Sequence, residues 1–243
     1  VAAILAEQAT AAQRDRWLLP LCSGAAGAAS FCLTEPGGGS DASALTTTAT
    51  RDGDDFVLNG SKTYISNGIN SDLVIVAGKS DLENNPHAMT LCVVERGLEG
   101  FERGRNLDKM GLKAQDTAEL FFNDVKIPKE NILGEVGHGF FYLMQGLAEE
   151  RLISATGSAA NARRAFNLTR DFVMERKVFG KPLANMQNTQ FKMAEMDAEI
   201  EILQAFIDHC VTEHNEGRLT VNMAAKAKLQ ATEIEWRMLD LGV

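Results

Sequence analysis

The stretch DDFVLNGSKTYISNG, residues 54–68, decides the fold. Apolar and polar residues alternate along it, and this two-residue period is typical of a half-buried strand. Its Asn59-Gly60 and Asn67-Gly68 dipeptides accept positive φ and favour tight turns. The stretch therefore predicts short antiparallel strands separated by turns.

The same pattern continues on both sides of this stretch. Asp52-Gly53 marks another turn, and further strand-like segments are LVIVAGKS, AMTLCVVERG and AELFFNDVKIP. We therefore predict a middle antiparallel β domain over residues 31–132.

Both flanks of this domain have helical patterns instead. Residues 1–30 read as the end of an N-terminal helical domain, with one alanine-rich helix that ends before Pro20. Helical periods return over 138–177, 186–216 and 219–243, interrupted by the segment FGKPLANM. Residues 133–243 are therefore predicted to form an antiparallel helical bundle that is incomplete. Such segregation indicates a multi-domain α and β protein rather than a βαβ nucleotide fold.

Composition excludes several functional classes. The chain has 243 residues, 45% of them apolar, and a formal charge of −9 without a basic run, which argues against nucleic-acid and anionic-membrane surfaces. No apolar run approaches the roughly 20 residues of a membrane-spanning helix. Because the sequence begins without methionine and stops in a helical pattern, we expect it to be an interior piece of a longer protein.

The cysteines and histidines indicate neither disulfides nor a metal. Cys22, Cys32, Cys92 and Cys210 are scattered without a CxxC pair, which suits reduced thiols in a cytoplasm or a mitochondrial matrix. The histidines show no metal-ligand spacing, so we expect no metal.

A glycine-rich loop, FCLTEPGGGSD at residues 31–41, is the first candidate site. Its glycines would let backbone N–H groups approach a ligand, and Thr34 and Ser40 add hydroxyls, so it could hold a pyrophosphate or a flavin edge. It lacks the GxGxxG and GxxxxGK[ST] patterns, and an ordinary turn is the competing interpretation.

Two further segments carry aromatic residues. In KTYIS, Tyr64 and Ser66 share one side of a strand, where they could meet a planar ring or form part of a cross-strand pair. In ERKVFGKPL, Arg176 and Lys177 precede Phe179 at the end of a helix, as an ordinary C-terminal cap would, but they could also meet a phosphate of another subunit.

The segment GLAEERLISATGSAAN, residues 146–161, raises the question of what its glutamates do. At helical spacing Glu150 neighbours apolar and small residues, whereas the stripe around Glu149 is less apolar. The alternative is that one of the glutamates is simply exposed or forms an ion pair with Arg151 or Arg163.

Five segments in this order resemble the acyl-CoA dehydrogenase family, most closely its long-chain type. They are TEPGGGSD, LNGSKTYISNG, KMGLKAQDTAELFFNDVKIPKENILGEVGHGF, ERL and ERKVFGKPLANMQNTQFKMAEM. The resemblance implies an N-terminal helical domain, a middle β domain and a C-terminal four-helix bundle.

The resemblance also implies a cofactor site. Positions that match FAD contacts in this family are Phe31, Leu33, Thr34, Gly39, Ser40, Tyr64, Ile65 and Ser66. Positions that match contacts to the FAD of a neighbouring subunit are Arg176, Val178, Phe179 and Gln187. A homodimer or homotetramer is therefore expected.

Glu150 matches the catalytic base of the long-chain and isovaleryl-type members, and Ser40, Leu147, Glu149 and Arg151 are the candidate substrate contacts. Glu149 has the same chemistry on another helix face. The implied reaction is oxidation of an acyl-CoA to a trans-2-enoyl-CoA, with an electron-transfer flavoprotein as acceptor, in a bacterial cytoplasm or a mitochondrial matrix.

Three alternatives remain open at this point. They are an isovaleryl-type or other short or branched acyl-CoA dehydrogenase, an acyl-CoA oxidase, and a flavin-free scaffold protein. The small residues Ser154, Ala155, Gly157 and Ala159 either open space for an acyl chain or allow close helix packing.

Overall fold

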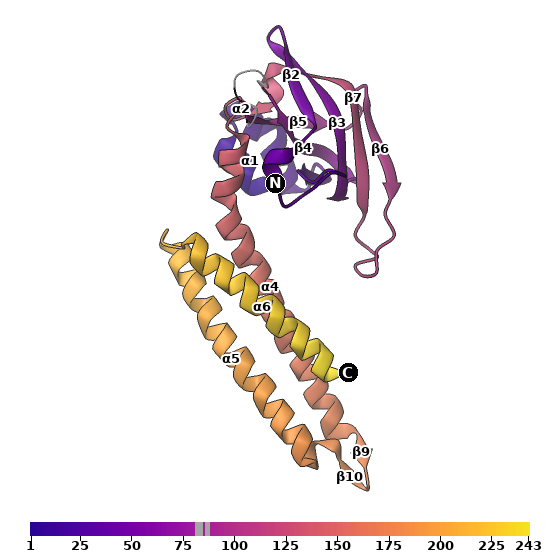
Figure 1. Ribbon diagram of the computed structural model, residues 1–243, viewed down its shortest axis with the longest axis vertical. Helices are drawn as coiled ribbons and strands as arrows, with labels where there is room; N and C mark the ends of the chain where they lie inside the picture. The colour runs from indigo at the N-terminus through magenta and orange to yellow at the C-terminus, as the bar shows by residue number, and fades with distance from the viewer. Residues whose placement is uncertain (81–84, 86–87) are drawn as a thin grey trace. The chain divides into compact units, whose positions relative to one another are not determined.

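The computed structural model describes residues 1–80, 85 and 88–243. The chain divides into two compact units, Val1–Met144 and Gln145–Val243. The first contains a β-sheet with short helices and the second contains long helices (Figure 1). The predicted combination of a β domain followed by a helical bundle is confirmed.

Within the described residues, eight strands form one sheet in the first unit. They are β1 (Ala28–Cys32), β2 (Thr48–Asp52), β3 (Asp55–Ser66), β4 (Ser71–Lys79), β5 (Met89–Glu95), β6 (Phe101–Asn106), β7 (Thr117–Ile127) and β8 (Ile132–Leu133). Seven follow the order β6-β7-β3-β2-β4-β5-β8, and β1 pairs with β4.

The sheet is mixed, so the prediction of a purely antiparallel domain is wrong in one respect. Strands β1 and β4 pair in parallel, and β2 meets β4 in parallel at one position, while the other pairs are antiparallel. A parallel pair needs a long connection, and β2 and β3 lie between β1 and β4 in the sequence.

The turn dipeptides are confirmed at two of three places. Gly53 has φ +64° between β2 and β3, and Asn67 has φ +61° after β3. Asn59-Gly60, in contrast, lies inside β3 at a β-bulge opposite β7. Gly60 is required there because its φ is +146° and an added Cβ would lie 2.7 Å from the Thr47 Cα.

Strand β4 explains the continuous apolar run LVIVAG. Val74 and Val76 belong to one apolar cluster with Leu58 and Leu120, whereas Leu73 and Ile75 belong to another. The second cluster also holds residues of the short N-terminal helices and β5. Because β4 is buried on both faces, its apolar residues do not alternate with polar ones.

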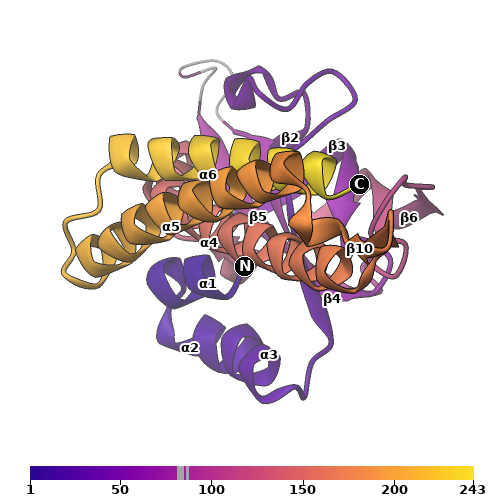
Figure 2. The same cartoon turned by 90° about the horizontal axis from the view of Figure 1, so that it is seen from below.

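The N-terminal segment is not the single helix predicted. It forms α1 (Ala2–Gln8), α2 (Ala11–Gln13), the π-helical turn η1 (Arg14–Leu18) and α3 (Leu19–Ser23), which lie next to one another (Figure 2). Ala9 is extended and Thr10 starts α2 with a capping box to Gln13. Pro20 lies inside the continuous helical run 11–23, in which η1 directly precedes α3, so the helix does not end before this proline as predicted.

Two 3₁₀ turns lie between strands of this sheet. They are η2 (Ala42–Ala44), between β1 and β2, and η3 (Lys129–Asn131), between β7 and β8. Helix α4 (Gly139–Glu175) follows, and the division between the units falls inside it.

Helices α4, α5 (Gln187–Asn215) and α6 (Val221–Gly242) build the second unit as predicted. Ala155, Ala159 and Ala162 of α4 are buried in one core with Ile200 of α5 and Ala231 of α6. The small residues Ala155 and Ala159 therefore serve helix packing. The segment FGKPLANM, predicted as a simple break, completes a small hairpin: β9 (Lys177–Val178) directly precedes it and pairs with β10 (Lys181–Pro182) inside it, and the turn η4 (Leu183–Asn185) follows.

Candidate functional site

The glycine-rich loop and the end of β3 lie against each other in the first unit. The Thr63 N–H donates to the Thr34 carbonyl at 2.9 Å. The Ser30 hydroxyl donates to the Ser66 carbonyl at 2.7 Å. The structure thus brings together two segments, 31–40 and 64–66, that were predicted to contact the same cofactor.

Tyr64 and Ser66 share one side of the strand as predicted, and both face outward, but strict alternation is not the reason. A bulge interrupts the β3–β7 register between Lys62 and Ile65, and Tyr64 adopts φ +58°. Lys62 and Ile65 are buried, whereas Ser66 is exposed and Tyr64 is 69% exposed. With unbroken alternation Tyr64 would share the inward face with Lys62, so the bulge turns the aromatic ring outward. Left-handed backbone at a tyrosine is strained, and such strain gathers at functional sites.

The glycine-rich loop is compact and has an open face. Glu35 and Gly38 exchange two backbone hydrogen bonds, each 3.0 Å long. An added Cβ at Gly37 or Gly38 would meet no heavy atom within 4 Å, whereas one at Gly39 would lie 3.2 Å from the Thr34 Cγ2. Gly39 is therefore tightly packed against Thr34, and the other two glycines leave space outside the loop.

These groups have the chemistry that a flavin cofactor needs. Phe31, Leu33 and Thr34 are half-buried and Ser40 is exposed. Apolar surface, hydroxyls and an outward aromatic ring occur together, beside backbone that a ligand can approach. The residues present therefore fit the FAD that the sequence predicts.

A buried ion pair supports the loop, and sequence reasoning missed it. Lys62 Nζ lies 2.8 Å from Glu35 Oε1, and the two side chains are 0% and 4% exposed. Lys62 Nζ also donates to the Leu33 carbonyl at 3.1 Å. The signal in the sequence was that Lys62 is in phase with the buried Phe56 and Leu58 of the same strand.

Hydrogen bonds keep Glu35 ionised in this interior. Burial raises the pKa of Glu35, but hydrogen bonds from Lys62, Thr46 and Thr47 outweigh that effect and lower the pKa from 4.5 to about 2. Burial also lowers the pKa of Lys62, against the attraction of Glu35. The loop's glutamate thus points inward and is matched by a cation, which leaves no bare carboxylate toward an anionic ligand.

Asp116 is a second supporting residue that the sequence did not single out. It is buried and accepts hydrogen bonds from the Ile69 N–H at 2.7 Å and the Asn70 amide at 2.8 Å. Its own carbonyl accepts from the Asn67 N–H at 3.1 Å. Asp116, in the motif AQDTAEL, therefore fixes the turn that follows Ser66.

Glu150 lies on the surface of α4 in the second unit. It is two residues from the buried Leu152, which places it about 200° around the helix, away from the core. Ile153, one of the apolar neighbours of Glu150 at helical spacing, does not enclose it inside this unit, where Ile153 is 64% exposed. Gly146 and Gly157, near Glu150 on α4, would each meet no heavy atom with an added Cβ.

The other predicted substrate contacts flank Glu150 on the same helix. Leu147, Glu149 and Arg151 are all half-buried. Glu149 is thus less exposed than Glu150, the reverse of what the two sequence stripes predict. The second unit therefore offers Glu150 as an accessible carboxylate with room beside it.

The predicted intersubunit residues lie just after α4, in the hairpin that follows it, and at the start of α5. Arg176 and Gln187 are exposed, and Val178 is half-buried. Phe179 is 96% exposed and has φ +48°, so an aromatic side chain is held outward on strained backbone. An exposed aromatic of this kind suits a contact with another protein surface.

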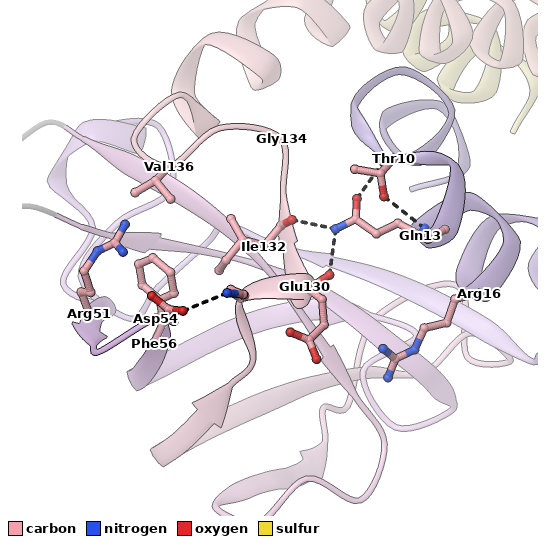
Figure 3. A pocket seen from close by; sticks show the side chains of 12 residues that line it. Thr10, Gln13, Arg16, Arg51, Asp54, Phe56, Glu130, Ile132, Gly134 and Val136 are labelled. Atoms are coloured by element: carbon pink, nitrogen blue, oxygen red, sulfur yellow. Dashed lines mark hydrogen bonds and ion pairs between the residues drawn. The ribbon is translucent and has the colours of Figure 1, made fainter.

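A separate pocket of about 560 Å³ lies between the N-terminal helices and the sheet (Figure 3). The Gln13 side chain lines this pocket, and its amide donates to the Glu130 and Ile132 carbonyls, both at 2.8 Å. Lys129 pairs with Asp54 at 2.8 Å on another side. None of the predicted site residues lines this pocket. The two hydrogen bonds of Gln13 join helix α2 to the segment of η3 and β8.

Reactive cysteines, metal sites or membrane-spanning helices in the described part of the chain would indicate another function. Cys32 and Cys92 are fully buried, and burial raises the pKa of each thiol to about 12, so neither is a ready nucleophile. Among the described residues no three His, Cys, Asp or Glu side chains gather as a metal site. No helix of the described part is both long and apolar enough to cross a membrane.

Comparisons with known families agree with this architecture. Residues 30–125 match the family described as "Acyl-CoA dehydrogenase, middle domain", and residues 137–243 match "Acyl-CoA dehydrogenase, C-terminal domain". The two matches together cover most of the chain.

Individual relatives give the same picture. The chain is 46% identical over 207 residues to the mitochondrial long-chain specific acyl-CoA dehydrogenase of Mus musculus, covering 84% of this chain and 48% of that protein. It is 38% identical over 230 residues to a short-chain specific acyl-CoA dehydrogenase of Megasphaera elsdenii, covering 94% and 60%. The chain thus spans about half the length of the long-chain relatives it matches.

Among solved structures, an acyl-CoA dehydrogenase from Geobacillus kaustophilus is similar at a TM-score of 0.95 and 43% identity, covering 98% of this chain and 63% of that one. The butyryl-CoA dehydrogenase from Megasphaera elsdenii is similar at a TM-score of 0.92 and 36% identity, covering 98% and 62%.

Proposed function

The chain belongs to the acyl-CoA dehydrogenase family, and on this premise we propose that it serves the FAD-dependent α,β-dehydrogenation of a fatty acyl-CoA to the trans-2-enoyl-CoA. The observation that carries the proposal is the contact between the glycine-rich loop and the end of β3, where Thr63 N–H meets the Thr34 carbonyl. This contact supports a cofactor site inside the first unit.

Residues of both segments would hold FAD. The hydroxyls of Thr34, Ser40 and Ser66 are suited to its polar edges, and the outward ring of Tyr64 is suited to its flat ring system. When bound, FAD supplies the acceptor for the β hydride of the substrate. The inward Glu35 keeps its negative charge away from the cofactor's phosphates.

Glu150 is the proposed base. An acyl-CoA has weakly acidic α hydrogens, and a carboxylate at contact distance takes one as the β hydride leaves, so that the C–C bond becomes a double bond. Exposure of Glu150 and open space at Gly146 and Gly157 give a substrate access to it. A carboxylate enclosed by an apolar acyl chain is a stronger base than one in water. Ser40, Leu147, Glu149 and Arg151 are the proposed substrate contacts.

We propose a long acyl chain as the substrate, because the mouse relative described as long-chain specific shares 46% identity. The short-chain relative of Megasphaera elsdenii at 38% and the isobutyryl-CoA dehydrogenase of Bos taurus at 38% support the short or branched alternative. Of the small residues on α4, Ser154 and Gly157 are exposed and are the positions that could admit an acyl chain. A Gly157→Leu variant that lost activity only with long substrates would support this role.

The proposed partners follow the same premise. Arg176, Val178, Phe179 and Gln187 contact the FAD of a neighbouring subunit in a homodimer or homotetramer. The electron acceptor is an electron-transfer flavoprotein. A similar solved structure, at a TM-score of 0.92 and 35% identity, is described as an electron transferring flavoprotein of Acidaminococcus fermentans. The compartment is a bacterial cytoplasm or a mitochondrial matrix, in line with relatives from both sources.

Anaerobic titration of the purified, FAD-loaded protein tests the proposal. Acyl-CoAs from butanoyl to hexadecanoyl should bleach the flavin absorbance, fastest with long chains. Bleaching only by short or branched substrates would favour the alternative specificity, and rapid peroxide formation in air would favour an oxidase. Failure of every acyl-CoA to bleach bound flavin would contradict the proposed reaction.

A further inference from the structure

The buried pair of Glu35 and Lys62 joins three separate segments of the chain. Lys62 Nζ in β3 donates to the Leu33 carbonyl and to Glu35 Oε1. Glu35 in turn accepts from the Thr46 N–H at 2.7 Å, the Thr46 hydroxyl at 2.6 Å and the Thr47 N–H at 3.0 Å. The pair therefore connects the start of the glycine-rich loop, the two residues just before β2, and strand β3.

The connected segments are the ones that carry the proposed cofactor residues. Leu33 and Thr34 directly precede Glu35, and Tyr64 follows Lys62 by two positions. The bulge after Lys62 turns Tyr64 outward while Lys62 itself stays inward. An inward Lys62 that is anchored to Glu35 thus determines where the bulge begins and where the ring of Tyr64 points.

Building such a pair is costly, which argues for a purpose beyond stability. Two charges removed from water are seldom more stabilising than a well-packed apolar pair of similar volume. A buried pair does, however, fix geometry, because either charge left alone would be strongly unfavourable. Five hydrogen bonds hold the two side chains in one arrangement: one joins Lys62 to Glu35, one joins Lys62 to the Leu33 carbonyl, and three join Glu35 to Thr46 and Thr47.

We propose that Glu35 and Lys62 are positioning residues that hold the glycine-rich loop and the Tyr64 bulge in the arrangement that accepts FAD, before any cofactor binds. Neither side chain contacts the cofactor, since both are buried. The inference rests on the proposed function for the identity of the cofactor. The preformed arrangement of the loop is a separate claim that can be tested without FAD.

Amide hydrogen exchange of the protein without added cofactor tests the preformed arrangement. The Thr46 and Thr47 amides bond to Glu35 and the Thr63 amide bonds to the loop, so they report on the pair. The amides of Val74 and Val94, which are paired residues of β4 and β5, report on global unfolding. In Lys62→Met the three reporter amides should lose protection by at least about tenfold relative to the core amides.

The pH dependence of protection separates positioning from bulk packing. In Lys62→Met the buried Glu35 carboxyl loses its cation, so its proton uptake moves toward neutral pH and the reporter protection should vary between about pH 5 and 8. Cys32, the other group that acts on Lys62, has its pKa raised to about 12 by burial and stays neutral in this range. Arg103, which acts on Cys32, stays charged.

The double variant Glu35→Gln/Lys62→Met is the matched control. It carries no buried charge, so its protection should be independent of pH in the same range, while the reporter amides remain less protected than in the wild type. If Lys62→Met does not fold, the double variant still reports the loss of local protection. Equal loss at reporter and core amides, without pH dependence, would overturn the proposal and leave only a contribution to stability.

FAD binding, followed by flavin fluorescence, tests the link to the cofactor. The dissociation constant should rise at least about tenfold in Lys62→Met and in the double variant, at temperatures where the core amides stay protected. Unchanged FAD affinity with lost loop protection would overturn the positioning role. If the wild type itself binds no FAD, the cofactor assignment fails, and the exchange result alone then supports or overturns the preformed loop.

Discussion

The two units carry their candidate residues in different ways. In the first unit, Tyr64 and the glycine-rich loop are fixed from beneath by buried polar groups, among them Glu35, Lys62 and Asp116. In the second unit, Glu150 is exposed on α4, whose opposite face forms the core, and Phe179 is exposed in the hairpin after it. The candidate site of the first unit is therefore held in place by buried contacts within that unit. In the second unit, the chemistry of the exposed side chains depends on the ligand or protein surface that contacts them.

This difference predicts different responses to mutation. A small change inside the first unit should disturb both stability and the site, because the same buried contacts support both. A change on the exposed face of the second unit should alter function with little effect on folding. The following variants test this contrast, beginning with the largest expected effect.

A pair of glycine variants gives the largest contrast. Gly60→Ala should destabilise the protein by about 3 kcal/mol or more, because φ is +146° and the new Cβ would lie 2.7 Å from the Thr47 Cα. Gly157→Ala should stabilise it by about 0.5–1 kcal/mol, because the position is helical and a Cβ there meets no heavy atom within 4 Å. Urea denaturation measures both; similar effects in the two variants would remove the proposed distinction.

Acid should weaken the first unit through Glu35. The folded-state pKa is about 2 and the ordinary value is 4.5, so ionised Glu35 contributes stability that is present above about pH 4.5 and is lost as the pH falls toward 2. The pH-dependent part is on the order of 3 kcal/mol. Thermal denaturation of the wild type and Glu35→Gln from pH 6 to pH 2 should give curves that converge at low pH. Parallel curves would contradict the assigned role of Glu35.

The smallest predicted stability effect is at the hairpin of the second unit. Phe179→Gly should raise stability by about 0.5–1 kcal/mol, because glycine accepts the φ of +48° and the ring is almost fully exposed. It should also weaken self-association, which analytical ultracentrifugation measures, if the ring meets a neighbouring subunit. Phe179→Ala is the matched control because it removes the ring and keeps the strain. Unchanged association in both variants would exclude the ring from a subunit contact.

Much of the fold follows from local patterns in the sequence. The helical periods predicted α4, α5 and α6, and the alternating segments predicted most strands, because burial on one face imposes these periods. The Asn59-Gly60 bulge and the helix break at Ala9 were not predicted. Both depend on tertiary contacts, such as the approach of Thr47 to Gly60, that short patterns do not encode.

The sequence identified the exposed residues of the candidate site, but not the buried residues that hold them in place. Ordered motifs identified Tyr64 and Ser66, and the structure brings their segment to the loop of Thr34. Glu35 and Lys62 are charged, so composition favours exposure for both, and only their mutual contact explains why they are buried. The setting of Glu150 was also not predictable, because the apolar stripe on α4 did not identify which face joins the core.

The central claim is that Glu150 takes the α proton of an acyl-CoA. The most direct test is the anaerobic rate of flavin bleaching by hexadecanoyl-CoA in the FAD-loaded protein, compared between Glu150→Gln and Glu149→Gln. We predict that Glu150→Gln slows bleaching by about 10²–10⁴-fold while Glu149→Gln stays within about tenfold of the wild type. Bleaching at the wild-type rate in Glu150→Gln would contradict the account.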